Sequence, residues 1–177
     1  AHRLAHVEHE HPPALDAFRQ QWPDVTLDLS AAFSFAPLPA LLRGDLDVVI
    51  TSDPQDNPAV HYEPLFRYEL VLAVSNQHPL SQYRYVEPFQ LTDQVLITYP
   101  VERNRLDIFT QFLTPADVEP AAIRQAELTP MIVQLVASQR GVTALPNWAL
   151  TEFLNPASIR TCRLGEHGIW RTLYATV

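Results

Sequence analysis

The sequence predicts an α/β protein built from two lobes, and three observations support that fold class. Residues 3–51 alternate between strand-like and helix-like segments, a pattern that favours a parallel sheet covered by helices. The alternation then breaks, because residues 59–75 contain two consecutive strand-like segments and residues 75–88 form a polar stretch with two prolines. Alternation resumes at residue 95, so we expect a second lobe of similar construction.

The first lobe is expected to comprise residues 1–74, together with a returning C-terminal strand at residues 172–177. Its first helix, at residues 14–22, places Leu15, Phe18 and Trp22 on one face, and Pro23 ends it. The other expected elements are strands at 3–8, 25–30 and 46–51 and a helix at 37–43.

The second lobe is expected to comprise residues 75–171, with residues 75–88 crossing over from the first lobe. Its long helix, at 129–140, is predicted to bury one apolar side and to end at a Gly141 cap. That apolar side comprises Leu128, Ile132, Leu135 and Val136. The remaining expected elements are strands at 95–98, 122–127, 142–145, 158–164 and 169–177 and helices at 103–113 and 147–154.

The segment 40-ALLRGDLDVVITSD-53 combines an adhesion-like tripeptide with three aspartates. Gly44 supplies the positive φ that a helix C-terminal cap requires, so the Arg-Gly-Asp sequence is interpreted as a helix end. Asp45 and Asp47 are interpreted as turn and surface residues, because alternate residues of a strand point to opposite faces. Thr51 and Ser52 lie at the carboxyl end of a strand, where open α/β sheets bind ligands.

Composition excludes several classes of function. Twelve basic against twenty acidic residues give a net charge of −8, which repels a phosphate backbone. A single cysteine, Cys162, permits no internal disulfide, so a cytoplasmic location is expected. No apolar run approaches the ~20 residues that cross a bilayer. The chain ends on an apolar strand-like segment, so a piece of a longer protein is expected.

Sequence motifs provide little support for catalysis. The chain contains no G-x-S-x-G, G-x-G-x-x-G or G-x-x-x-x-G-K-[ST] motif, so no catalytic residue and no cofactor are predicted. His2, His6, His9 and His11 have no recognisable zinc-site spacing, so no metal is predicted. What remains is helix starts that follow strand ends. At one of them Thr129 is a good N-cap with Pro130 at the first helical position, a place suited to a carboxylate.

Three segments resemble the effector-binding domain of LysR-type transcriptional regulators: ALLRGDLDVVIT, LFRYELVLAVSNQHPL and GVTALPNWAL. Others, among them LITYPVERNRLDIFTQFL, resemble the regulators of methionine biosynthesis within that family. The resemblance implies two Rossmann-like lobes of the periplasmic-binding-protein type II kind, joined by crossover strands. It also implies homocysteine as coinducer, a homodimer or tetramer, and DNA binding through an N-terminal winged helix-turn-helix domain absent from this chain.

The same resemblance implies that the effector lies in the interlobe cleft, against three groups of residues. The loop after the second strand offers Phe33, Ser34 and Phe35, and the end of the third strand offers Thr51 and Ser52. The second lobe offers Tyr99, Pro100, Val101, Thr129, Pro130 and Met131. Two other functions share this architecture: a solute-binding protein for an amino acid or small anion, and, with less support, an enzyme.

Overall fold

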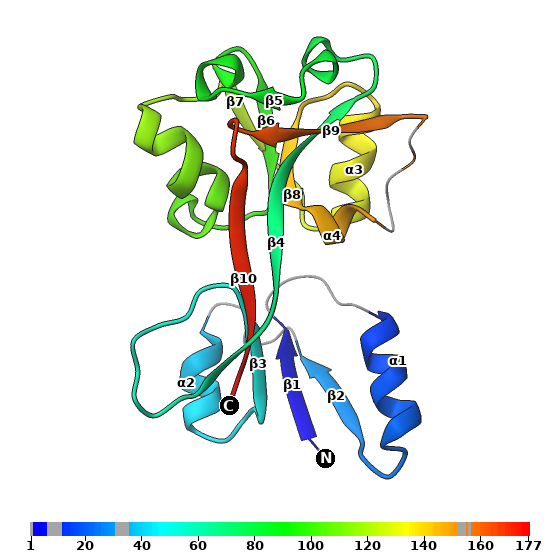
Figure 1. Ribbon diagram of the computed structural model, residues 1–177, viewed down its shortest axis with the longest axis vertical. Coiled ribbons are helices and arrows are strands. Elements are labelled where there is room, and N and C mark those ends of the chain that lie inside the picture. Colours follow the sequence, from blue (N-terminus) through cyan, green and yellow to red (C-terminus); the bar gives the residue numbers. More distant parts are fainter. Residues whose placement is uncertain (1, 7–11, 31–35, 152–154, 156) are drawn as a thin grey trace. The chain divides into compact units, whose positions relative to one another are not determined.

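The computed structural model describes residues 2–6, 12–30, 36–151, 155 and 157–177. It divides the chain into two compact units (Figure 1). Unit 1 comprises residues 1–67 and 172–177, and unit 2 comprises residues 68–171. The α/β class expected from the sequence is confirmed, because each unit combines strands with covering helices.

Unit 1 is built on parallel strands in the order β2-β1-β3, with β10 antiparallel at the edge of β3. Ala40, Leu46 and Val49 form its small buried cluster. The strands of this unit are β1 (His2–His6), β2 (Leu27–Ser30) and β3 (Val48–Thr51), and the helices are α1 (Pro12–Gln21) and α2 (Pro37–Leu42).

Gly44 ends α2 as the sequence predicts, with φ +80°. Its N–H donates to Leu41 O (3.0 Å), and the Asp45 N–H donates to Ala40 O (2.9 Å), which is the paired arrangement of a Schellman cap. Arg43 of the same tripeptide pairs with the Asp45 carboxylate at 2.9 Å. The Arg-Gly-Asp sequence is therefore a helix end.

The segment predicted as two strands, 59–66 and 68–75, is one long strand, β4 (Tyr62–Ser75). The expected division into two strands is wrong, because no Gly, Asn or Asp stands between Phe66 and Tyr68 to make a turn. Burial changes sharply along β4, since the side chains from Glu63 to Arg67 are exposed and those from Tyr68 to Ser75 are buried. The division between the units falls at this change, between Arg67 and Tyr68, whereas the sequence pattern predicts it after Val74.

Residues 75–88 do not cross between units, so that prediction was also wrong. They form η1 (Pro79–Gln82) and β5 (Tyr85–Val86), and η2 (Pro88–Leu91) follows, all within unit 2. The stretch is held there by the buried side chains of Leu80 and Val86, and Leu91 of η2 is buried just after it. The chain instead passes between units within the long strands β4 and β10 (Ile169–Thr176).

Unit 2 holds the larger core. Within it, β4 pairs antiparallel with β8 (Thr143–Pro146) and β9 (Ile159–Leu164), and β9 pairs with β5. Strands β6 (Val95–Thr98) and β7 (Ala122–Gln125) pair in parallel. The helical elements not yet named are η3 (Arg103–Arg105), η4 (Ile108–Leu113), η5 (Thr114–Ala116), α3 (Thr129–Ala137) and α4 (Asn147–Leu150).

The helix expected at 103–113 is interrupted. Leu106 adopts an extended conformation (φ −108°, ψ 114°), which ends η3 and separates it from the π-helical turn η4. Four apolar side chains of η4 are buried, so the turn is part of the packed interior of unit 2. Part of the helix expected at 147–154 forms α4, and residues 152–154 lie outside the described residues.

Helix α3 begins at its predicted residue, Thr129, but differs from its prediction in its apolar side and at its C-terminal end. Ile132, Val133 and Val136 face the core, whereas Leu128 is 57% exposed, so its assignment to the apolar side was wrong. The helix ends three residues early, and Gln139, with φ +57°, takes the left-handed position assigned to Gly141. Gly141 is required for another reason, because a Cβ there would lie 2.6 Å from Val95 O.

Candidate functional site

A bond between two hydroxyl-bearing residues joins the end of β6 to the start of α3. Tyr99 directly follows β6, and Thr129 is the first residue of α3. Their side-chain oxygens, Oη and Oγ1, lie 2.5 Å apart. Thr129 is fully buried and Tyr99 is half-buried against the core cluster under α3. This contact fixes the strand end and the helix start relative to each other.

Thr129 is not the N-cap that the sequence predicts. The N–H groups of Met131 and Ile132 donate to Leu128 O at 3.0 and 3.1 Å, so Leu128 is the capping position. Pro130 has no N–H, and that of Met131 is already paired, which reduces the backbone's capacity to bind an anion here. The polar chemistry at this helix start therefore comes from the Tyr99 and Thr129 hydroxyls.

The residues that follow Tyr99 and Thr129 in the chain are apolar. The Val101 N–H donates to Tyr99 O at 2.8 Å in a tight turn, which leaves Pro100 exposed and Val101 half-buried. Pro130 is exposed, and the Met131 side chain is 52% exposed. The six expected residues of the second lobe therefore fall on two adjoining segments, 99–101 and 129–131, bridged by the Tyr99–Thr129 contact.

The expected contacts from the first lobe belong to unit 1. Thr51 is the last residue of β3, and its Oγ1 accepts the Asp53 N–H at 3.1 Å, so it also shapes the turn that follows. Thr51 and Ser52 are both half-buried. The other three expected residues of this lobe, Phe33, Ser34 and Phe35, lie outside the described residues.

Among the residues that the structure describes, no group of three or more His, Cys, Asp or Glu side chains is placed to hold a metal ion. The side chains of the N-terminal histidines lie outside the described part of the chain. Neutral hydroxyls with apolar neighbours can orient a small polar ligand, and they offer no evident acid–base or nucleophilic set.

Cys162 has a structural role inside unit 2. Its thiol is buried in β9 and donates to Leu80 O at 3.2 Å. Burial raises the pKa of this thiol, and the positive charge of Arg160 opposes that shift. The thiol is therefore poorly suited to act as a nucleophile.

No helix within the described residues is both long enough and apolar enough to span a membrane.

Sequence reasoning missed a set of charged side chains around the segment that follows Tyr99. Arg103 Nη1 lies 2.8 and 2.7 Å from the two carboxylate oxygens of Glu119, and its guanidinium lies 4.7 Å from the centre of the Phe109 ring. Asp107 pairs with Arg171 of β10 at 3.5 Å. The segment 102-ERNRLD-107 is rich in charged residues, and this could have indicated that its side chains form ion pairs. The partners lie far away in the sequence, so they could not be identified from it.

Comparison with known proteins shows one family over almost the whole chain. Residues 6–177 match the LysR substrate binding domain. The HTH-type transcriptional regulator MetR of Escherichia coli K12 is 40% identical over 165 residues, covering 93% of this chain and 51% of that protein. MetR of Salmonella typhimurium is 38% identical over the same share of each chain. The chain thus spans about half the length of these curated relatives.

A solved structure agrees with the sequence matches. The regulatory domain of NMB2055 (MetR), a LysR family regulator from N. meningitidis, superposes with a TM-score of 0.85 at 33% identity. The superposition covers 99% of this chain and 83% of that chain. The expected periplasmic-binding-protein-like α/β fold is thereby confirmed.

Proposed function

The chain belongs to the LysR substrate-binding domain family, and from that premise we propose that it is the effector-sensing domain of a transcriptional regulator of methionine biosynthesis. The observation that carries this proposal is 40% identity, over 93% of the chain, to a regulator named MetR. DNA binding is assigned to an N-terminal winged helix-turn-helix domain outside this chain. The net charge of −8 supports that division of labour.

Homocysteine is the proposed coinducer, because the site residues match its chemistry. An amino acid carries a carboxylate that accepts hydrogen bonds, and the Tyr99–Thr129 pair has one O–H left to donate, because one hydroxyl of the pair gives its hydrogen to the other. Its thiol-bearing chain requires an apolar, polarisable surface, which Val101 and the exposed Met131 thioether supply. The proposed contacts from unit 1 are Thr51 and Ser52, with Phe33, Ser34 and Phe35 beside them.

Sensing requires no reaction in this proposal. A ligand changes a conformational equilibrium by as much as its affinity differs between the two states. Thr129 is buried and holds Tyr99, so a ligand that takes over one of these hydroxyls changes the contact between the β6 end and the α3 start. The cytoplasm is the expected location of such a sensor.

Oligomerisation, as a homodimer or tetramer, is the second part of the proposal. Each unit carries exposed apolar side chains: Phe18 (37% exposed) and Trp22 (54%) along and just after α1, and Leu128 (57%) at the start of α3. Apolar surface of this kind is stabilised by burial against another chain. In the proposed antiparallel dimer, α1 and β2 of one protomer meet the second unit of its partner.

Isothermal titration of the chain with homocysteine, methionine and cysteine tests the coinducer assignment. We expect homocysteine to bind most tightly and Thr129→Val to weaken its binding by about tenfold, the cost of one buried hydrogen bond to a charged group. Thr92→Val, an exposed threonine on the surface of unit 2, is the matched control. Equal affinity for the three amino acids, or no binding, would remove homocysteine from the proposal.

A further inference from the structure

The segment 99–107 connects the hydroxyl pair to the core of unit 2, and we call it the site loop. It begins at Tyr99, whose hydroxyl contacts Thr129, and it ends at Asp107, directly before η4. Ile108 and Phe109, the next two residues, are 3% and 2% exposed, so the loop's second end is attached to a packed element. Within the loop, Glu102 and Arg103 carbonyls accept the N–H groups of Arg105 and Leu106 at 3.0 Å.

One side-chain anchor holds the middle of the loop. Arg103 pairs with Glu119 on the segment that leads into β7, and its guanidinium stacks over Phe109. Both charged side chains are more than half exposed, at 52% and 69%. Water and salt screen such a pair, so this anchor contributes little beyond the packing on Phe109.

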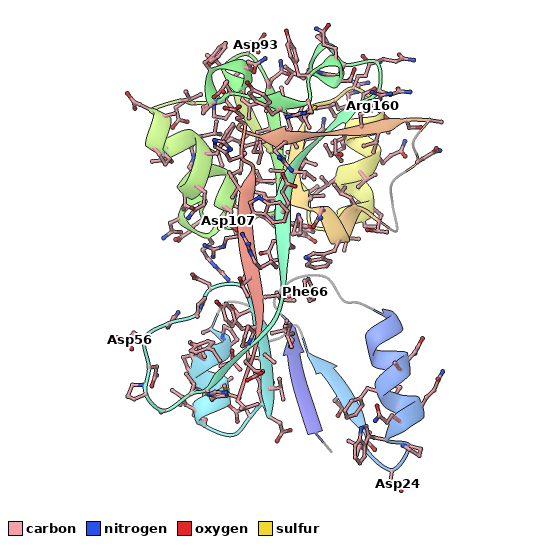
Figure 2. All side chains as sticks on the ribbon, in the orientation of Figure 1. Asp24, Asp56, Phe66, Asp93, Asp107 and Arg160 are labelled. Atoms are coloured by element: carbon pink, nitrogen blue, oxygen red, sulfur yellow. The ribbon has the colours of Figure 1, made fainter. Side chains whose placement is uncertain are left out.

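A second anchor holds the end of the loop and is better shielded. The carboxylate of Asp107, which is labelled in Figure 2, lies 3.5 Å from Nε of Arg171 in an ion pair that is not a hydrogen bond. Each of the two side chains is only 23% exposed. Reduced exposure weakens screening and makes the loss of one partner more costly than at the surface. Arg171 is also the last residue of unit 2 on β10, because the chain passes into unit 1 at Thr172.

We propose that Arg171 is a positioning residue for the effector site and acts through Asp107. The Asp107–Arg171 pair links the site loop to β10, the strand that leaves the unit. A change in the position of Arg171 on β10 is therefore expected to move the site loop, and Val101 with it. The segments involved are near in space and distant in the sequence. The effect on ligand affinity rests on the proposed function, whereas the effect on the loop itself does not.

Hydrogen exchange of the 177-residue chain without ligand, read by mass spectrometry, tests the positioning. In Arg171→Gln we expect faster exchange of the amides of 101–106 and unchanged exchange in β4 and β9. Arg171→Lys keeps the charge and should restore most of the protection. Asp107→Asn preserves the shape of the side chain and removes the other charge of the same ion pair. It replaces Arg171→Gln in the experiment if that variant folds poorly. Arg160→Gln, on the exposed face of β9, is the matched control (Figure 2).

Titration with homocysteine provides the second measurement. Loss of a partly shielded ion pair should weaken binding by about fivefold in Arg171→Gln and leave Arg160→Gln unchanged. Wild-type exchange rates in the loop of Arg171→Gln and Asp107→Asn, or faster exchange with undiminished affinity, would overturn the proposal. If the wild-type chain itself binds no homocysteine, the coinducer assignment fails, and the exchange experiment alone decides the positioning role.

Discussion

The hydroxyls of three buried threonines in unit 2 differ in their hydrogen bonding. Thr129 uses its hydroxyl to hold Tyr99, and Thr143 donates to Ile97 O at 2.8 Å. Thr98, the last residue of β6, is 5% exposed, and its Oγ1 has no hydrogen-bond partner within the described residues. A buried hydroxyl without a partner is a cost to the folded state, so residue type alone does not indicate which threonine matters.

Replacing Thr98 by Val should leave the free energy of unfolding unchanged or raise it by up to about 1 kcal/mol, since an isosteric methyl replaces an unpaired hydroxyl. Thr143→Val is the matched comparison, because it removes a hydrogen bond and leaves Ile97 O short of a donor. That variant should lose about 1–2 kcal/mol. Urea denaturation of the three chains measures the difference, and equal losses in the two variants would contradict this account.

At the scale of the element, α3 illustrates where sequence patterns succeed. The pattern correctly identifies Ile132 and Val136 as core residues, since both are fully buried. It fails at Leu128, because the pattern extends the apolar side to a residue that precedes the first helical turn and is extended. Both ends of the helix are set by local backbone geometry: Leu128 is extended, and Gln139 is left-handed.

Truncation of α3 at two positions separates these roles. Ile132→Ala removes a fully buried side chain from the cluster with Ile97 and Leu145, and we expect it to cost about 2–5 kcal/mol. Leu128→Ala should cost less than about 0.5 kcal/mol, because the side chain is already more than half exposed. Thermal melts followed by circular dichroism provide the measurement. A large loss for Leu128→Ala in the monomeric chain would show that the residue packs within its own protomer.

At the scale of the whole molecule, the sequence predicts local features well and long-range contacts poorly. Strand β6 is found at its predicted residues, 95–98, and Gly44 ends α2 as expected, because both depend on short-range rules. The long strand β4 escaped prediction, since its exposed and buried halves resemble two strands. In the site, the sequence predicts Tyr99 and Thr129 as two individual contact residues, without the bond between their hydroxyls. Their contact, and that of Asp107 with Arg171, join segments that only folding brings together.

The exposed aromatic residues near α1 carry a prediction about assembly. Trp22→Glu replaces an apolar side chain that is 54% exposed with a charged one. It should therefore dissociate the proposed dimer and leave the fold of the monomer intact. The lost burial of an indole corresponds to at least about tenfold weaker association. Sedimentation equilibrium of the chain at several concentrations measures that change, with far-ultraviolet circular dichroism as the check on folding.

The control for this prediction is Phe89→Glu. Phe89, on η2 of unit 2, is 69% exposed, so it matches Trp22 in character and exceeds it in exposure. Because it lies on neither α1 nor α3, its substitution should leave the association constant unchanged. If any exposed aromatic side chain contributed to association, both variants would weaken it. If the interface is specific to α1, only Trp22→Glu should weaken it. Dissociation by Phe89→Glu with no effect of Trp22→Glu would move the interface away from α1, to the surface that carries η2.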